Sequence, residues 1–105
     1  MLFESWIPNN TEKFKGKVIE VSTNLGIQPD WLMAVMFSES RLKPDIVNKV
    51  SGATWLIQFM PSTASGLGTT TAALKKMSNV DQLDYVEKYF YPYRNACMYY
   101  LTLFF

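Results

Sequence analysis

The sequence predicts a mainly α-helical single domain, in which residues 1–10 form an N-terminal arm. A run of seven apolar residues from Trp31 to Phe37 leaves no polar face, as is typical of the buried central helix of a small domain. Pro29 and Asp30 suit a first helical turn, because proline has the required φ and a negative charge favours the helix N-terminus. We therefore predict a helix from about Pro29 to about Ser40.

The other helices follow from apolar spacing and from residues that begin or end helices. A helix over about 11–25 places apolar residues on one face, and Gly26 ends it. Ser78 and Asp81 resemble a capping box before a helix over about 79–90. Residues 42–52 are rich in loop residues, and 55–60 suit a short strand or an extended bend. Three further helices are expected over about 61–65, 72–77 and 95–105.

Composition limits the chemistry that the chain can perform. The chain has 105 residues, 49% of them hydrophobic, which suits one domain with a core and argues against disorder. The net charge of +1 gives no basic excess for binding nucleic acid. There is no histidine and Cys97 is the one cysteine, which excludes an internal disulfide, a Cys/His metal site and a histidine-assisted nucleophile. We expect no metal and no cofactor, and acid–base chemistry must use carboxylates, lysine or tyrosine.

The sequence also carries expectations about location. The opening residues have no basic flank and no long apolar run, so we expect no signal peptide. No apolar run reaches the length of a membrane span. The chain is therefore expected to be made as a soluble protein that needs another route to any site outside the cell.

Glu39 is the residue whose position suggests catalysis. A carboxylate in the last helical turn faces the negative end of the helix dipole, and apolar neighbours would disfavour its charged form. Both effects favour the protonated acid, which is the form that a general acid needs. The alternative is a solvated surface glutamate, which is common at helix ends.

Two segments together resemble a known family. Glu39-Ser-Arg-Leu-Lys-Pro44 and Ser51-Gly-Ala-Thr-Trp-Leu-Ile-Gln-Phe-Met-Pro-Ser-Thr-Ala64 are similar to the two signature blocks of lytic transglycosylase (SLT), goose-type-lysozyme-like proteins. The continuations at 66–70 and 82–92 are similar to phage-encoded members. The resemblance spans roughly residues 25–93, and the two blocks in this order are more specific than either alone.

The resemblance implies a lysozyme-like fold with a groove for peptidoglycan glycan strands. Glu39 would protonate the glycosidic oxygen between N-acetylmuramic acid and N-acetylglucosamine, while the substrate's N-acetyl oxygen assists. Glu39 would then act as a base on the sugar 6-hydroxyl, giving a 1,6-anhydro product, or on water. Asp30 is about 13 Å away along the helix, too far for a retaining pair. Asp45 could approach, although a solvated or capping role suits it as well.

The same resemblance suggests residues that bind the sugars. Ser40 and Gln58 would position the N-acetyl sugar or Glu39; a helix-end hydroxyl and a buried amide are their structural alternatives. Met60 would form core or groove wall, and Tyr89 and Tyr93 are candidates for stacking on sugar rings. Where the family has glycine this chain has Trp55, which either fills part of the groove or stacks on a sugar.

Three functions therefore remain open. The first is peptidoglycan cleavage by a phage endolysin in the host cytoplasm or by a virion-associated lysin acting on the cell wall. The second is a peptidoglycan-binding or virion structural module whose groove Trp55 occludes. The third is a helical interaction module that meets the virion or another copy through its aromatic C-terminus, where Phe104 and Phe105 suggest truncation or docking. The family's later Tyr-Asn-Ala-Gly-like segment is only weakly matched by residues 94–97.

Overall fold

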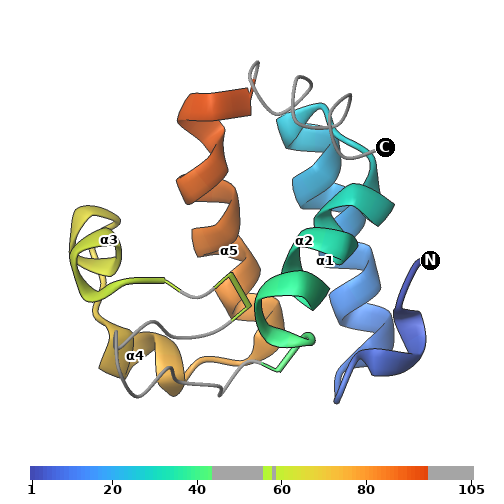
Figure 1. Ribbon diagram of the computed structural model, residues 1–105, viewed down its shortest axis with the longest axis horizontal. Coiled ribbons are helices and arrows are strands. Elements are labelled where there is room, and N and C mark those ends of the chain that lie inside the picture. The colour runs from blue at the N-terminus through green and yellow to red at the C-terminus, as the bar shows by residue number, and fades with distance from the viewer. Residues whose placement is uncertain (44–55, 58, 95–105) are drawn as a thin grey trace.

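The structure, a computed structural model, describes residues 1–43, 56–57 and 59–94. These residues form helices and turns, with an isolated β-bridge at Phe59 and no strand within the described ranges. The mainly α fold class is therefore confirmed. The elements are η1 (Glu4–Trp6), α1 (Thr11–Leu25), α2 (Pro29–Ser40), α3 (Pro61–Gly66), α4 (Thr71–Lys75), α5 (Asn79–Phe90) and η2 (Tyr91–Tyr93). Figure 1 shows α1 and α2 together on one side of α5, with α3 and α4 on the other.

The three long helices have the bounds that the sequence predicts, because local chemistry fixes their ends. Gly26 follows α1 with a φ of 70°, a left-handed conformation that glycine adopts without strain. Pro29 opens α2 at its first turn. The Ser78 side chain accepts a hydrogen bond from the Asp81 backbone N–H at 3.1 Å and caps α5.

One prediction about the shorter elements needs correction. Helix α4 spans Thr71–Lys75 rather than 72–77, because Thr70 caps it by accepting a hydrogen bond from the Ala73 N–H at 3.0 Å. Asn10 precedes α1 but makes no capping bond with its side chain, which instead donates to Asn79 at 3.2 Å. Most of the expected loop over 42–52, part of the 55–60 segment and the expected helix over 95–105 lie outside the described residues.

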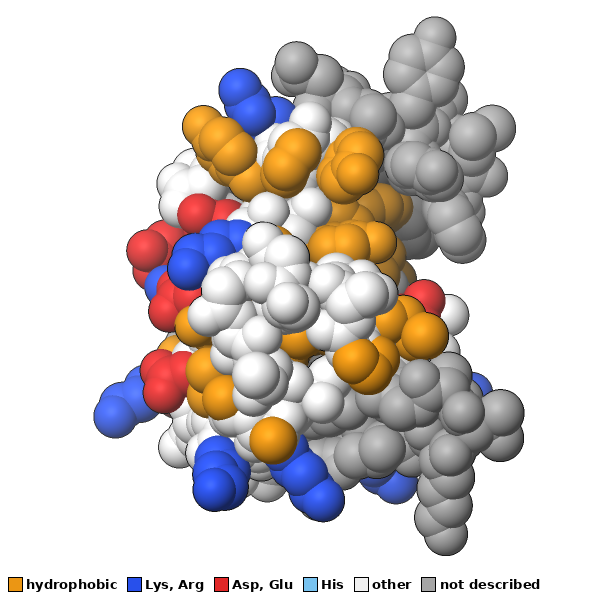
Figure 2. Space-filling view, turned by 90° about the vertical axis from the view of Figure 1, so that its left-hand side faces the viewer, with side chains coloured by type: hydrophobic (Ala, Val, Ile, Leu, Met, Phe, Trp, Pro, Cys, Tyr) orange, Lys and Arg blue, Asp and Glu red, His pale blue; other side chains and the backbone are white. Residues whose placement is uncertain are grey.

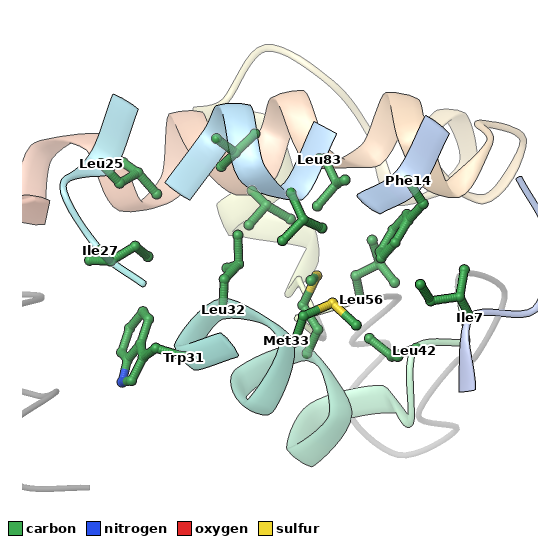
Figure 3. Close-up of a cluster of buried hydrophobic side chains, with 14 of the residues drawn as sticks. Ile7, Phe14, Leu25, Ile27, Trp31, Leu32, Met33, Leu42, Leu56 and Leu83 are labelled. Atoms are coloured by element: carbon green, nitrogen blue, oxygen red, sulfur yellow. The ribbon is translucent and has the colours of Figure 1, made fainter. Parts of the chain in front are cut away.

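The hydrophobic core lies between α1, α2 and α5, as Figure 3 shows. Helix α2 buries Leu32, Met33 and Met36 completely, as expected for a helix without a polar face. Ile7 from the arm and Leu56 from the segment before α3 complete the same cluster. Both ends of α2 are thus held in one core, which fixes the turn that carries Glu39.

The N-terminal arm is fastened to the helices at several points. The Leu2 backbone N–H donates to the Asp30 carboxylate at 2.9 Å, next to the start of α2. Glu4 forms an ion pair with Lys15 of α1, and the Asn79 amide of α5 donates to the Asn9 carbonyl at 3.0 Å.

Among the described helices, none is long and apolar enough to cross a membrane.

Candidate active site

Helix α2 places Glu39 in its last turn, as predicted from the sequence. The side chain is exposed, and within the described residues it makes no hydrogen bond and no ion pair. The described residues therefore do not provide the apolar surroundings that we expected from the sequence. Only a bound substrate that excludes water from this carboxyl group could provide such surroundings.

The next residue, Ser40, connects the two sequence blocks. It is 2% exposed, and its Oγ lies 3.0 Å from the Met36 carbonyl oxygen and 3.1 Å from the Leu56 carbonyl oxygen. The single hydroxyl proton can be donated to either carbonyl. Because Ser40 is buried, it suits positioning of Glu39 better than direct contact with a sugar.

Leu56 and Ile57 are described residues between α2 and α3 in the chain. Leu56 is fully buried and Ile57 is half-buried, and both lie in a turn. Phe59 is also buried, so the segment is fastened on both sides of residue 58. Leu56 and Phe59 are therefore held in the core, and the Ser40–Leu56 contact joins Leu56 to the last turn of α2.

The described carboxylates that form hydrogen bonds or ion pairs form them with groups other than Glu39. Asp30 accepts a hydrogen bond from Leu2, at the opposite end of α2. Glu4 faces Lys15, and Asp84 faces Lys17 on α1. A mechanism with two cooperating carboxylates thus finds no support in the described residues, and Asp45 lies outside them.

A row of aromatic rings lies at the end of α5. Tyr89 packs edge-to-face on buried Phe59, with ring centroids 5.9 Å apart, and lies 6.5 Å from Tyr93. Tyr89, Tyr93 and Met60 are all exposed. Figure 2 shows hydrophobic side chains gathered at this upper end of the molecule. The structure therefore brings Tyr89 and Tyr93 beside Phe59, and exposed Met60 follows Phe59 in the chain.

Two predicted site residues, Trp55 and Gln58, lie outside the described residues. Within the described ranges, no three acidic or cysteine side chains are grouped so that they could hold a metal ion.

Sequence reasoning missed a cluster around Phe37, whose ring stacks on Phe3 at 3.9 Å. It also missed the left-handed backbone of Arg41 and Leu42. Neither feature has a local sequence signal, since both depend on tertiary packing.

A comparison with models of protein families matches residues 17–96 to the model described as "Transglycosylase SLT domain". This range includes Glu39, Ser40 and the whole second block, together with Tyr89 and Tyr93. Searches of curated proteins and of solved structures found no match.

Proposed function

The chain belongs to the transglycosylase SLT family, and from this premise we propose that it cleaves peptidoglycan glycan strands with Glu39 as general acid and base. Members of this family are lytic transglycosylases, whose substrate is peptidoglycan. The bond proposed to break is the β-1,4 link between N-acetylmuramic acid and N-acetylglucosamine.

The contact between Ser40 and Leu56 is the observation that carries the proposal. It joins the helix turn that holds Glu39 to the segment that leads to residue 58. The backbone next to Glu39 is then fixed to the core, and such preorganisation is what a catalytic group requires. The exposed carboxyl group is accessible to a glycan strand.

One carboxyl group suffices for the chemistry that we propose. Glu39 donates its proton to the leaving glycosidic oxygen, while the N-acetyl oxygen of the substrate attacks the anomeric carbon. Glu39, now a carboxylate, then removes a proton from the sugar 6-hydroxyl, whose oxygen attacks the anomeric carbon and closes a 1,6-anhydro ring. In the hydrolytic alternative, Glu39 removes the proton from a water molecule that attacks the same carbon. Its proton is restored in either case.

The aromatic region supplies the proposed binding surface. Tyr89 is held by Phe59, which fixes one ring beside the Leu56–Phe59 segment. Tyr93 and Met60 offer further exposed apolar surface for the faces of sugar rings. We assign the amide of Gln58 to the N-acetyl group, by analogy with the family's second block.

Clearing of a murein suspension tests the proposal. The Glu39→Gln variant should lose about 10²- to 10⁴-fold in rate, the usual contribution of a general acid. Glu12→Gln, the same substitution at an exposed position of α1, should clear at the unmodified rate. Equal rates for both variants would contradict the role of Glu39. Mass spectrometry of the released fragments distinguishes the 1,6-anhydro product from the hydrolytic one.

A module that binds peptidoglycan without cleaving it is the alternative, and Trp55 in place of the family's glycine is the observation that favours it. Such a module sediments with murein and leaves the suspension turbid. If the indole occludes the groove, Trp55→Gly should increase the clearing rate strongly. An unchanged rate would exclude occlusion.

For a cleaving protein, we propose a phage endolysin or a virion-associated lysin as the setting.

A further inference from the structure

The turn that follows Glu39 has an unfavourable backbone. Arg41 and Leu42 have φ values of 57° and 64°, in the left-handed region that residues with bulky side chains rarely adopt. Such conformations persist only where the surroundings hold them, and they concentrate at functional sites. Glu39 is two residues before Arg41, so the contacts that hold this turn also hold the backbone from which the Glu39 side chain projects.

The N-terminal arm provides the contacts that hold this turn from outside. Phe3 stacks on Phe37 with centroids 3.9 Å apart and an interplanar angle of 4°, and Trp6 packs edge-on against Phe37 at 5.1 Å. The Arg41 guanidinium lies over the Phe37 ring at 4.5 Å, a distance that allows a cation–π interaction. Phe37 therefore links the arm to the first left-handed residue of the turn.

The arm also reaches the second left-handed residue through the core. Leu42 is fully buried, and Ile7 belongs to the same hydrophobic cluster. Figure 3 shows Ile7, Phe14 and Leu42 at one end of this cluster. The arm thus contributes to both anchors of the turn: the ring cluster on the surface and the hydrophobic cluster inside.

The arm acts from the side of α2 that faces away from the carboxyl group. Leu2 contacts Asp30 and Phe3 contacts Phe37, two positions seven residues apart that share one helix face. Glu39 lies about 200° around the helix from Phe37, at about 100° per residue. The arm therefore leaves the substrate side of Glu39 free.

We propose that the N-terminal arm positions the acid of the active site, with Phe3 as a positioning residue that acts on Glu39 through Phe37 and Arg41. This inference rests on the proposed function of Glu39 and adds a second requirement to it. Without the Phe3 ring, the turn at 41–42 loses part of its support, and the carboxyl group samples directions that do not reach the glycosidic oxygen.

The test measures cleavage of soluble glycan strands by Phe3→Leu, Phe3→Tyr and the unmodified chain. Phe3→Leu should lower kcat by about tenfold to a hundredfold, the range that a small misplacement of a catalytic group produces, with KM unchanged. Phe3→Tyr retains the ring and should restore kcat. Thr70→Ala is the control for stability, because it removes the cap of α4, and Thr70 belongs neither to the ring cluster nor to the hydrophobic cluster. This variant should lower the melting temperature and leave kcat unchanged in the folded protein.

A second readout does not depend on cleavage. The ¹³C resonance of the Glu39 carboxyl group can be assigned by its loss in Glu39→Gln. It should shift or broaden in Phe3→Leu and remain as in the unmodified chain in Phe3→Tyr and Thr70→Ala. An unchanged resonance in Phe3→Leu, or an unchanged kcat in a chain that cleaves glycan, would overturn the positioning role. An unmodified chain that cleaves no glycan would instead overturn the proposed function, while the resonance still decides whether the arm orients Glu39.

Discussion

The hydroxyl of Ser40 lies 3.1 Å from the carbonyl oxygen of Leu56, and this contact fastens the last residue of α2 to the segment before α3. Both residues are buried, so the hydrogen bond is protected from water. The bond explains why a small hydroxyl residue follows the acid, since a larger side chain would separate the two segments. It also joins the last turn of α2, which carries Glu39, to the backbone at Leu56.

We predict that Ser40→Ala lowers the free energy of unfolding by about 1–3 kcal/mol, because the buried Leu56 carbonyl loses its hydrogen-bond donor. Ser38→Ala is the matched control, since Ser38 is exposed on the same helix. It should change the free energy by less than about 0.5 kcal/mol. Urea unfolding followed by circular dichroism measures both. Equal effects from the two variants would show that the contact adds nothing to stability.

The long helices could be predicted to the residue because their limits are local. Gly26, Pro29 and Ser78 each mark an end by their own backbone or capping chemistry, and apolar spacing defines the buried faces. The α4 helix was predicted less well, since its end at Lys75 has no comparable signal.

The candidate site was predictable only in part. The position of Glu39 at the end of α2 follows from the apolar run and from Pro29. Its exposure does not, because exposure depends on which distant segments cover it. The stack of Phe3 on Phe37 likewise joins residues that are far apart in sequence, and neither has a neighbour that signals the contact.

Two glycines, Gly16 inside α1 and Gly26 directly after it, should respond to alanine with opposite signs. Gly26 has a φ of 70°, so Gly26→Ala forces a side chain into the left-handed region and should destabilise the protein by about 1 kcal/mol or more. Gly16 lies inside the helix, and a Cβ built there meets nothing within 4 Å. Gly16→Ala should therefore stabilise the protein by about 0.5–1 kcal/mol. Thermal unfolding of the two variants checks both signs. A destabilised Gly16→Ala would mean that this face of α1 is covered by another part of the chain.

The ion pair between Lys17 and Asp84 should make stability depend on pH in the alkaline range. The two side chains lie 2.7 Å apart and connect α1 to α5. Their hydrogen bond raises the pKa of Lys17 above its usual 10.5. A raised lysine pKa means that the stabilisation is complete below pH 10.5 and is lost as the pH rises through the pKa of the folded protein.

We predict that Lys17→Met lowers the free energy of unfolding by less than about 1 kcal/mol at neutral pH, as for most surface pairs. This difference should shrink with added salt and above pH 10.5. Lys13→Met is the control, because Lys13 is exposed and has no ion pair among the described residues. Urea unfolding at pH 7 and pH 11 compares the variants. A difference that stays constant between these pH values would assign the effect to packing of the lysine stem.

Binding of glycan strands should depend on Tyr93 more than on Tyr91, although both rings are exposed. Tyr93 is 59% exposed and adjoins Tyr89, whereas Tyr91 is 49% exposed and carries the Arg94 guanidinium 4.2 Å from its ring centre. If sugars stack on the row that begins at Phe59, Tyr93→Ala should raise KM by about two- to tenfold. This corresponds to about 0.5–1.5 kcal/mol of ring contact. Tyr91→Ala should leave KM unchanged. Steady-state cleavage of soluble glycan fragments measures both constants, and an equal rise in the two variants would place the binding surface elsewhere.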